Sequence, residues 1–174
     1  MVDKERLNAL EVALDNEMRE REFYLKKAEK TKNPLGKLMF QQIAEEELEH
    51  YERLKQLHEQ WKKGAKWPDT VPLEVNGTRV KNMLIRVTKM AEEVSEQNAN
   101  DLKAIRTAIA FEAKGAKYYA ELSEKVSDPK EKAFFKLLAQ IENEHYLTLK
   151  DTEEYLTDPG SWYRKIEHHG LDGA

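Results

Sequence analysis

The strongest constraint on the fold of this chain is an internal repeat. Shifting the 174-residue sequence by 95 positions aligns residues 3–63 with residues 98–158 without a gap, and 18 of the 61 aligned positions are identical. The identities include Leu7/Leu102, Ala13/Ala108, Tyr24/Tyr119, Pro34/Pro129, Phe40/Phe135 and Leu54/Leu149. A duplication of this length predicts two copies of one supersecondary unit, packed together so that they bury a shared core.

Each copy has the pattern of a helical hairpin. Apolar residues recur at spacings of three and four, which is typical of one face of an α-helix. Asn33-Pro34 and Asp128-Pro129 each place a capping side chain before a proline, so a new helix should begin at each pair. We therefore expect an all-α protein with long helices over about 3–31, 34–63, 100–126 and 129–156.

The segment between the hairpins is long enough to run the length of the bundle. Turn residues gather in 64–78, and an apolar-periodic stretch over 80–94 predicts a shorter helix within the connection. Because a helix of about 30 residues is roughly 45 Å long, 34 connecting residues can cross it and leave the second and third long helices parallel. This is the one-crossover topology of ferritin-like four-helix bundles.

We expect one domain over 1–174, with a hairpin at 3–63, a crossover at 64–97, a hairpin at 98–158 and a C-terminal tail at 159–174. Asp158-Pro159-Gly160 should end the last long helix, and Trp162–His169 should form a short one. His168-His169, in this tail, favour a packing or subunit contact over a second metal site. His58, next to an inward leucine, is expected at the surface.

Composition excludes several classes of function. The net charge of −4 and the lack of a basic block argue against nucleic acid as a partner. The absence of cysteine excludes disulfides, thiolate nucleophiles and rubredoxin-type iron sites within these residues. The sequence has neither a run of about 18 apolar residues nor an apolar leader, so we expect no membrane span and a cytoplasmic location.

Charged residues interrupt the apolar faces of all four long helices at one level. The inward positions of the second helix are Phe40, Ile43, Glu47, His50, Leu54, Leu57 and Trp61, and those of the fourth are Phe135, Leu138, Glu142, His145, Leu149, Thr152 and Leu156. Glu17 shares a face with Leu7, Leu10 and Tyr24, and Glu112 shares one with Leu102, Ile105 and Tyr119. Four carboxylates and two imidazoles should therefore meet in the core.

Such a layer requires cations, because each buried carboxylate costs several kcal/mol unless it is compensated. Two divalent ions balance four glutamates with neutral histidines, and oxygen-rich ligation with one imidazole per ion favours iron, manganese or a mixed pair. This pattern is typical of di-iron and di-manganese carboxylate bundles. A single Glu-x-x-His on a Glu-rich helix is usually a solvated face, but two in apolar register predict a di-metal site of Glu17, Glu47, His50, Glu112, Glu142 and His145.

Over about 3–156 the chain resembles the rubrerythrin branch of the ferritin-like superfamily. The resemblance rests on Glu17 with Tyr24, Glu47 to His50, Glu112 with Tyr119, and Glu142 to His145. It implies that Glu17 and Glu112 bind terminally, that Glu47 and Glu142 bridge two irons, and that each histidine completes one iron. It also implies that Tyr24 and Tyr119 donate hydrogen bonds to ligating carboxylates, although a role as core aromatics stays open.

The chain departs from the family pattern in two respects. Rubrerythrins carry a rubredoxin-like domain on four cysteines, which this sequence lacks, so a reductant would have to come from a separate electron-donor protein. They also have an extra glutamate three residues after the third-helix ligand, where this chain has Gly115. Its repeat mate is Glu20, and our hypothesis is that Glu20 takes the extra-ligand role from the opposite side, with an exposed surface glutamate as the alternative.

The expected function is a di-iron oxidoreductase that reduces hydrogen peroxide to water, because two ferrous ions can deliver two electrons to one oxidant. Dioxygen is the other candidate oxidant. The alternatives are a ferroxidase linked to iron storage, which needs a cage, and a helical scaffold with a structural metal or none. A homo-oligomer is expected, with a dimer as the default.

Overall fold

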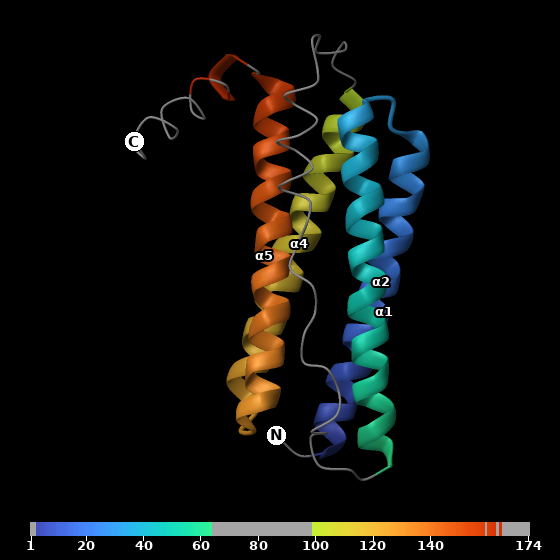
Figure 1. Cartoon of the computed structure of the whole chain (residues 1–174), viewed down its shortest axis with the longest axis vertical. Helices are drawn as coiled ribbons and strands as arrows, with labels where there is room; N and C mark the ends of the chain where they lie inside the picture. The colour runs from blue at the N-terminus through green and yellow to red at the C-terminus, as the bar shows by residue number, and fades with distance from the viewer. Residues whose placement is uncertain (1–2, 64–98, 159, 163, 165–174) are drawn as a thin grey trace.

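The computed structural model describes residues 3–63, 99–158, 160–162 and 164, without the side chains of 3–6, 35, 61 and 99. Four long helices make up this part of the chain (Figure 1): α1 Asp3–Lys30, α2 Pro34–Lys62, α4 Ala99–Lys125 and α5 Pro129–Thr157. The predicted helix ends are therefore confirmed to within a residue or so. The expected turns at 64–78, the helix at 80–94, the side chain of Trp61, His168-His169 and most of the helix at 162–169 lie outside the described residues.

The helices form an all-α, ferritin-like bundle of two hairpins. Helix α1 packs along α2, and α4 packs along α5, while α1–α4 and α2–α5 contacts join the two hairpins. Helix α2 ends at the opposite end of the bundle from the start of α4, so the two run parallel (Figure 1). The predicted topology is confirmed by this arrangement. None of the described helices is long and apolar enough to cross a membrane.

The predicted caps begin the second helix of each hairpin. The Asn33 side-chain oxygen accepts a hydrogen bond from the backbone N–H of Gly36 at 3.1 Å. Asp128 accepts from the backbone N–H groups of Lys130 at 2.8 Å and Glu131 at 3.2 Å. These bonds satisfy donors that have no partner within the helix, and the proline that follows each cap has no N–H to satisfy.

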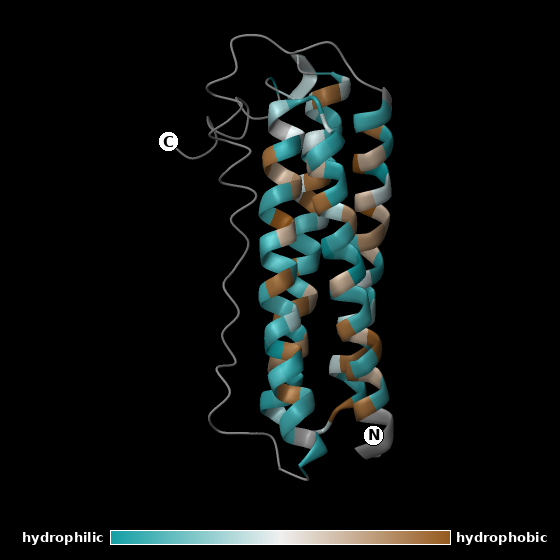
Figure 2. Ribbon diagram, turned by 90° about the vertical axis from the view of Figure 1, so that its right-hand side faces the viewer, coloured by the Kyte–Doolittle hydropathy of each residue, from teal (hydrophilic) through white to brown (hydrophobic). Residues whose placement is uncertain are grey.

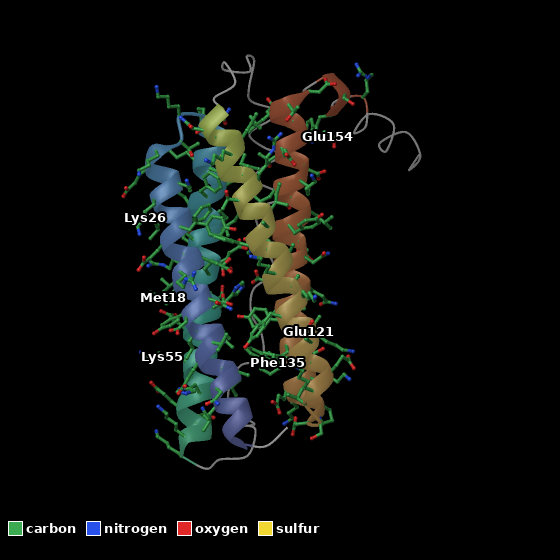
Figure 3. All side chains as sticks on the ribbon, turned by 180° about the vertical axis from the view of Figure 1, so that it is seen from behind. Met18, Lys26, Lys55, Glu121, Phe135 and Glu154 are labelled. Atoms are coloured by element: carbon green, nitrogen blue, oxygen red, sulfur yellow. The ribbon has the colours of Figure 1, made fainter. Side chains whose placement is uncertain are left out.

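Two apolar clusters fill the bundle, one toward each end. One gathers Tyr24, Phe40, Ile43, Ala108 and Leu149, and the other gathers Leu10, Leu54, Tyr119, Phe135 and Leu138. Polar and apolar residues alternate along each ribbon (Figure 2), and Figure 3 shows Phe135 between the hairpins while Lys26 and Lys55 point outward. On each helix the residues between the clusters are those of the predicted charged layer, which therefore lies at mid-height.

The prediction that His58 lies at the surface is wrong. Only 8% of this residue is exposed, and its Nε2 lies 3.2 Å from Oε1 of Glu11 on α1. A helix in a four-helix bundle packs against two neighbours, so its buried stripe is wider than one row of inward positions. His58 occupies the flank of α2 that covers α1.

Candidate metal centre

All six predicted ligands converge in the middle of the bundle. Helix α1 supplies one carboxylate, α4 supplies one, and α2 and α5 each supply a carboxylate and an imidazole one turn apart. None of these residues is more than 2% exposed: Glu17, Glu47, His50, Glu112, Glu142 and His145. A spacing of three puts the glutamate and histidine of α2, and likewise those of α5, on one face of the helix.

The ligand atoms form two overlapping groups. Glu17, Glu47, His50 and Glu142 offer one set, and Glu47, Glu112, Glu142 and His145 offer the other. Within each set the donor atoms lie within 4.8 Å of one another. Because Glu47 and Glu142 belong to both sets, two ions could bind side by side with these two carboxylates between them.

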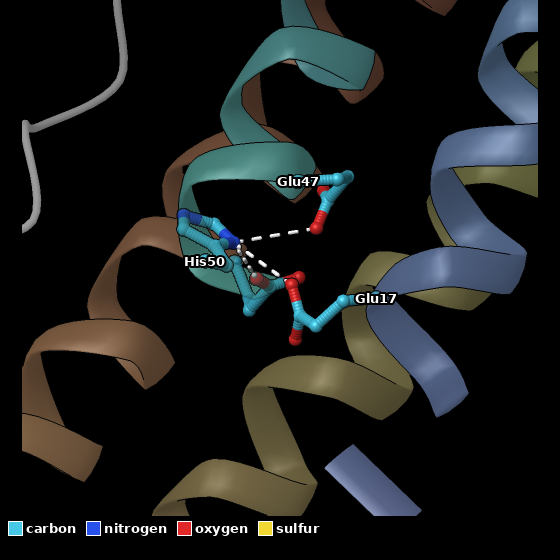
Figure 4. Close-up of side chains that lie close together, drawn as sticks. Glu17, Glu47 and His50 are labelled. Atoms are coloured by element: carbon cyan, nitrogen blue, oxygen red, sulfur yellow. Dashed lines mark hydrogen bonds and ion pairs between the residues drawn. The ribbon is translucent and has the colours of Figure 1, made fainter. Parts of the chain in front are cut away.

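Three carboxylates from three helices surround one ring nitrogen of His50. Its Nδ1 lies 3.1 Å from Glu17 Oε2, 3.3 Å from Glu47 Oε2 and 3.3 Å from Glu142 Oε1. Figure 4 shows the Glu17 and Glu47 carboxylates directed at the imidazole. A ring nitrogen has at most one proton to donate, so it cannot satisfy three acceptors, whereas a cation among these atoms would contact all of them.

His145 occupies the equivalent position in the second hairpin. Its Nδ1 lies 3.3 Å from Glu112 Oε2 and 3.6 Å from Glu47 Oε1. The two imidazole rings are stacked, with centroids 6.1 Å apart and an interplanar angle of 21°. The repeat therefore produces two similar sets of potential ligand atoms, which share Glu47 and Glu142.

Two tyrosines reach across between the hairpins and hold the carboxylates of Glu112 and Glu17. The Tyr24 hydroxyl on α1 donates to Oε1 of Glu112 on α4, and the Tyr119 hydroxyl on α4 donates to Oε1 of Glu17 on α1. In both cases the other oxygen, Oε2, is the one that lies beside a histidine. Each tyrosine thus occupies the outward oxygen and leaves the inward one directed at the centre.

Without metal, the layer keeps protons on carboxyl groups that are ordinarily ionised, and several of its polar atoms still lack hydrogen-bond partners among the described residues. Burial and the charge of Glu142 raise the pKa of Glu47 well above its usual range, and burial with the charge of Glu112 raises the pKa of Glu142 to about 8. Oε1 of Glu47, both carboxylate oxygens of Glu142 and Nε2 of His50 are buried without a hydrogen-bond partner among the described residues. Unpaired carboxylate oxygens beside imidazoles are a donor set that fits iron or manganese.

Comparison with known proteins agrees with this geometry. The family model described as rubrerythrin matches residues 8–153. The chain belongs to the rubrerythrin family. The solved structure of a hypothetical protein from Pyrococcus furiosus is similar to this rubrerythrin-family chain at 29% identity and a TM-score of 0.65, covering 87% of this chain and 90% of that one. No curated protein matches the chain significantly.

Glu20 lies beside the centre and is only half-buried. Burial and the negative charges of Glu142 and Glu112 raise the pKa of Glu20 to about 10. It is close enough to interact with these carboxylates, yet it belongs to neither group of converging donor atoms among the described residues. The hypothesis that Glu20 is an extra ligand therefore stays a prediction.

Gly115, the repeat mate of Glu20, is in contact with the Glu142 carboxylate. A Cβ atom at position 115 would lie 2.8 Å from Oε2 of Glu142, 3.3 Å from its Cδ and 3.4 Å from its Cγ. The space that the glycine leaves in this rubrerythrin-family bundle is therefore filled by a central carboxylate from α5.

Sequence reasoning missed a buried acid that lies directly beside the candidate centre. Glu46 belongs to a Glu-rich run and is not among the predicted inward positions, but it is only 5% exposed, and its Oε2 lies 2.7 Å from Nε2 of His145. The repeat carried a signal that could have found it, because the residue equivalent to Glu46 is the apolar Ile141. An isoleucine at that position indicates a buried side of the helix.

We predict that Gly115→Ala weakens metal binding while it leaves the metal-free fold intact. The new methyl group must displace the Glu142 carboxylate, whereas alanine is favoured over glycine within a helix by up to about 1 kcal/mol. Metal affinity measured by calorimetry should fall, and the unfolding temperature of the metal-free variant should hold or rise. Unchanged affinity would show that Glu142 does not need this position to bind metal.

We predict that the metal-free protein loses stability as the pH rises from about 6 to 9. Burial and the charge of Glu112 raise the pKa of Glu142 from 4.5 to about 8. For His145, burial lowers the pKa, but the charge of Glu112 and other contacts raise it from 6.5 to about 10. The folded state therefore binds more protons than the unfolded state in this window, and each such group costs up to about 1.4 kcal/mol per pH unit.

The measurement is thermal unfolding of chelator-treated protein across this pH range, beside the same protein loaded with metal. Bound metal replaces the protons, so the loaded protein should lack this decline. Burial raises the pKa of Glu17, but hydrogen bonds with His50, Glu47 and Tyr119 outweigh it and lower this pKa below 4.5, so Glu17 changes stability only in acid, outside this pH range. A metal-free stability that rises with pH would contradict the assignment of a proton-compensated layer.

Proposed function

We propose that this chain is a di-iron oxidoreductase that reduces hydrogen peroxide to water. The observation that carries the proposal is the pair of overlapping buried donor groups that share Glu47 and Glu142. Membership of the rubrerythrin family supports the same reading. The four glutamates carry a charge of −4 when ionised, which two divalent ions balance while both histidines stay neutral.

Each predicted ligand has a proposed place around such a pair of ions. Glu17 with His50 and Glu112 with His145 would each bind one ion, and Glu47 with Glu142 would lie between the two. When bound in the ferrous state, the two irons would supply two electrons to one molecule of oxidant. Hydrogen peroxide that takes up two electrons and two protons yields two molecules of water, which balances the reaction.

The surroundings of the site suit a small oxidant. Apolar clusters lie above and below the charged layer, so the donors act in a low-dielectric environment in which electrostatic interactions are strong. Tyr24 and Tyr119 hold the terminal carboxylates and keep one oxygen of each directed inward. The described residues offer no cysteine for a rubredoxin-type site, so we propose a separate protein as the electron donor.

We predict about two irons per chain in protein purified without oxygen, and their loss in a Glu47→Ala/Glu142→Ala variant. The reason is that these two carboxylates belong to both donor groups. Iron would be counted by mass spectrometry, and oxidation of the ferrous protein would then be followed by stopped-flow absorbance. We expect hydrogen peroxide to oxidise the pair faster than dioxygen does, with one peroxide consumed per two irons.

Other outcomes of this experiment point to the other functions. Faster oxidation by dioxygen, with ferric iron accumulating in an assembly of cage size, would favour a ferroxidase linked to storage. Wild-type protein that takes up no iron after ferrous loading would leave a helical scaffold and overturn the enzyme proposal. The variant should keep its helical circular-dichroism signal, since removal of two repelling carboxylates does not remove apolar core.

We also propose that Glu20 binds one of the two metals. If it does, Glu20→Gln should speed release of metal to a chelator by about tenfold, the lower end of effects seen when a group that supports a metal site is lost. Glu22→Gln provides a matched control, because Glu22 lies on the same helix with its side chain 62% exposed and paired with Lys26. Equal release rates for the two variants would remove Glu20 from the ligand set.

A further inference from the structure

The two halves of the centre differ behind their histidines. Nε2 of His145, on the side of the ring away from the central carboxylates, lies 2.7 Å from Oε2 of Glu46. Nε2 of His50 is buried and has no hydrogen-bond partner among the described residues. The repeat explains the difference, because the residue equivalent to Glu46 is Ile141, which is 2% exposed.

Glu46 is itself held in place from behind. Its second oxygen, Oε1, accepts a hydrogen bond of 2.8 Å from Nε2 of Gln42, one turn earlier on α2. Gln42 is also buried, and its equivalent in the second hairpin is Leu137. A polar chain of Gln42, Glu46 and His145 thus runs from α2 to α5, and the corresponding positions in the other half are apolar.

The hydrogen bonds from Gln42 through Glu46 to His145 determine which nitrogen of His145 is available to a metal. An imidazole that binds a cation through Nδ1 must be neutral and carry its proton on Nε2. A carboxylate 2.7 Å from Nε2 accepts that proton in a hydrogen bond, which fixes both the tautomer and the rotation of the ring. Nδ1 then stays directed at Glu112 and Glu47. No described residue gives His50 this support.

We propose that Glu46 is a positioning residue that acts through His145 and makes the two metal positions unequal. The inference rests on the proposed metal centre and goes beyond it. The metal beside His145 gains a ligand that is pre-oriented and made more basic by a buried anion, and the metal beside His50 does not. The metal beside His145 is therefore bound more tightly than the metal beside His50.

The sequence of the second hairpin suggests which substitutions of Glu46 to compare. Glu46→Ile installs the residue type found in the other half, and Glu46→Gln keeps the shape and an acceptor oxygen while removing the charge. Glu45→Gln is the control, because Glu45 is the exposed neighbour on the same helix and the charge change is identical. Circular dichroism and thermal unfolding would establish that each variant folds.

The test is a double-mutant cycle on Mn²⁺ affinity, measured by calorimetry on metal-free full-length protein. We expect Glu46→Ile to weaken binding by about 10- to 100-fold in the wild-type and His50→Ala backgrounds. In the His145→Ala background the same change should cost less than about threefold, because the group through which Glu46 acts is gone. Glu46→Gln should fall between Glu46→Ile and wild type, and Glu45→Gln should match wild type.

Two results would overturn the inference without touching the proposed function. One is an equal loss of affinity in all three backgrounds, which would assign Glu46 a general structural role. The other is no loss in any background, with wild-type protein still binding two ions. Wild-type protein that binds no Mn²⁺ and no Fe²⁺ would instead overturn the metal centre, and the role of Glu46 with it.

Discussion

Mutual repulsion among four buried carboxylates is the constraint on which the rest of this bundle depends. Apolar packing above and below the layer cannot offset it, and the two imidazoles can carry at most two positive charges. Without metal, the layer compensates by keeping protons, as the raised pKa values of Glu47 and Glu142 indicate. The same oxygen atoms that lack hydrogen-bond partners are the ones that two divalent cations would satisfy.

Duplication accounts for the near-symmetry of the centre and also locates the places where symmetry is broken. Glu17 and Glu112, Glu47 and Glu142, and the two histidines are repeat mates. Three further pairs around them differ in kind: Glu20/Gly115, Gln42/Leu137 and Glu46/Ile141. In each pair the first hairpin supplies the polar residue and the second an apolar residue or glycine. The first hairpin thus adds the acids Glu20 and Glu46 around the shared carboxylates. The two proposed metal positions therefore differ in their surroundings.

The sequence predicted most of this arrangement because its signals were physical and redundant. Helix starts followed from Asn33-Pro34 and Asp128-Pro129, and the charged layer followed from ionisable residues at positions otherwise filled by Phe40, Leu54 and their mates. Residues on the flanks of the helices were harder. His58 and Glu46 lie beside the main row of inward positions, where spacing alone does not distinguish a buried flank from a solvated one. For Glu46, the apolar residue at the equivalent position of the repeat indicates burial. The repeat equivalent of His58 is the charged Glu153, which gives no such indication.

At Gly115, helix α4 gives up some stability and thereby leaves space for the Glu142 carboxylate. A glycine in the interior of α4 weakens the helix by about 0.5–1 kcal/mol relative to alanine, and nothing about a four-helix bundle requires one at that point. A Cβ atom at position 115 would lie 2.8 Å from Oε2 of Glu142, so the end of that side chain would have to move to make room for a methyl group. Glu142 belongs to both donor groups, so its displacement would disturb both proposed metal positions at once. The glycine therefore makes sense as part of the centre, even though it carries no side chain that could bind a metal.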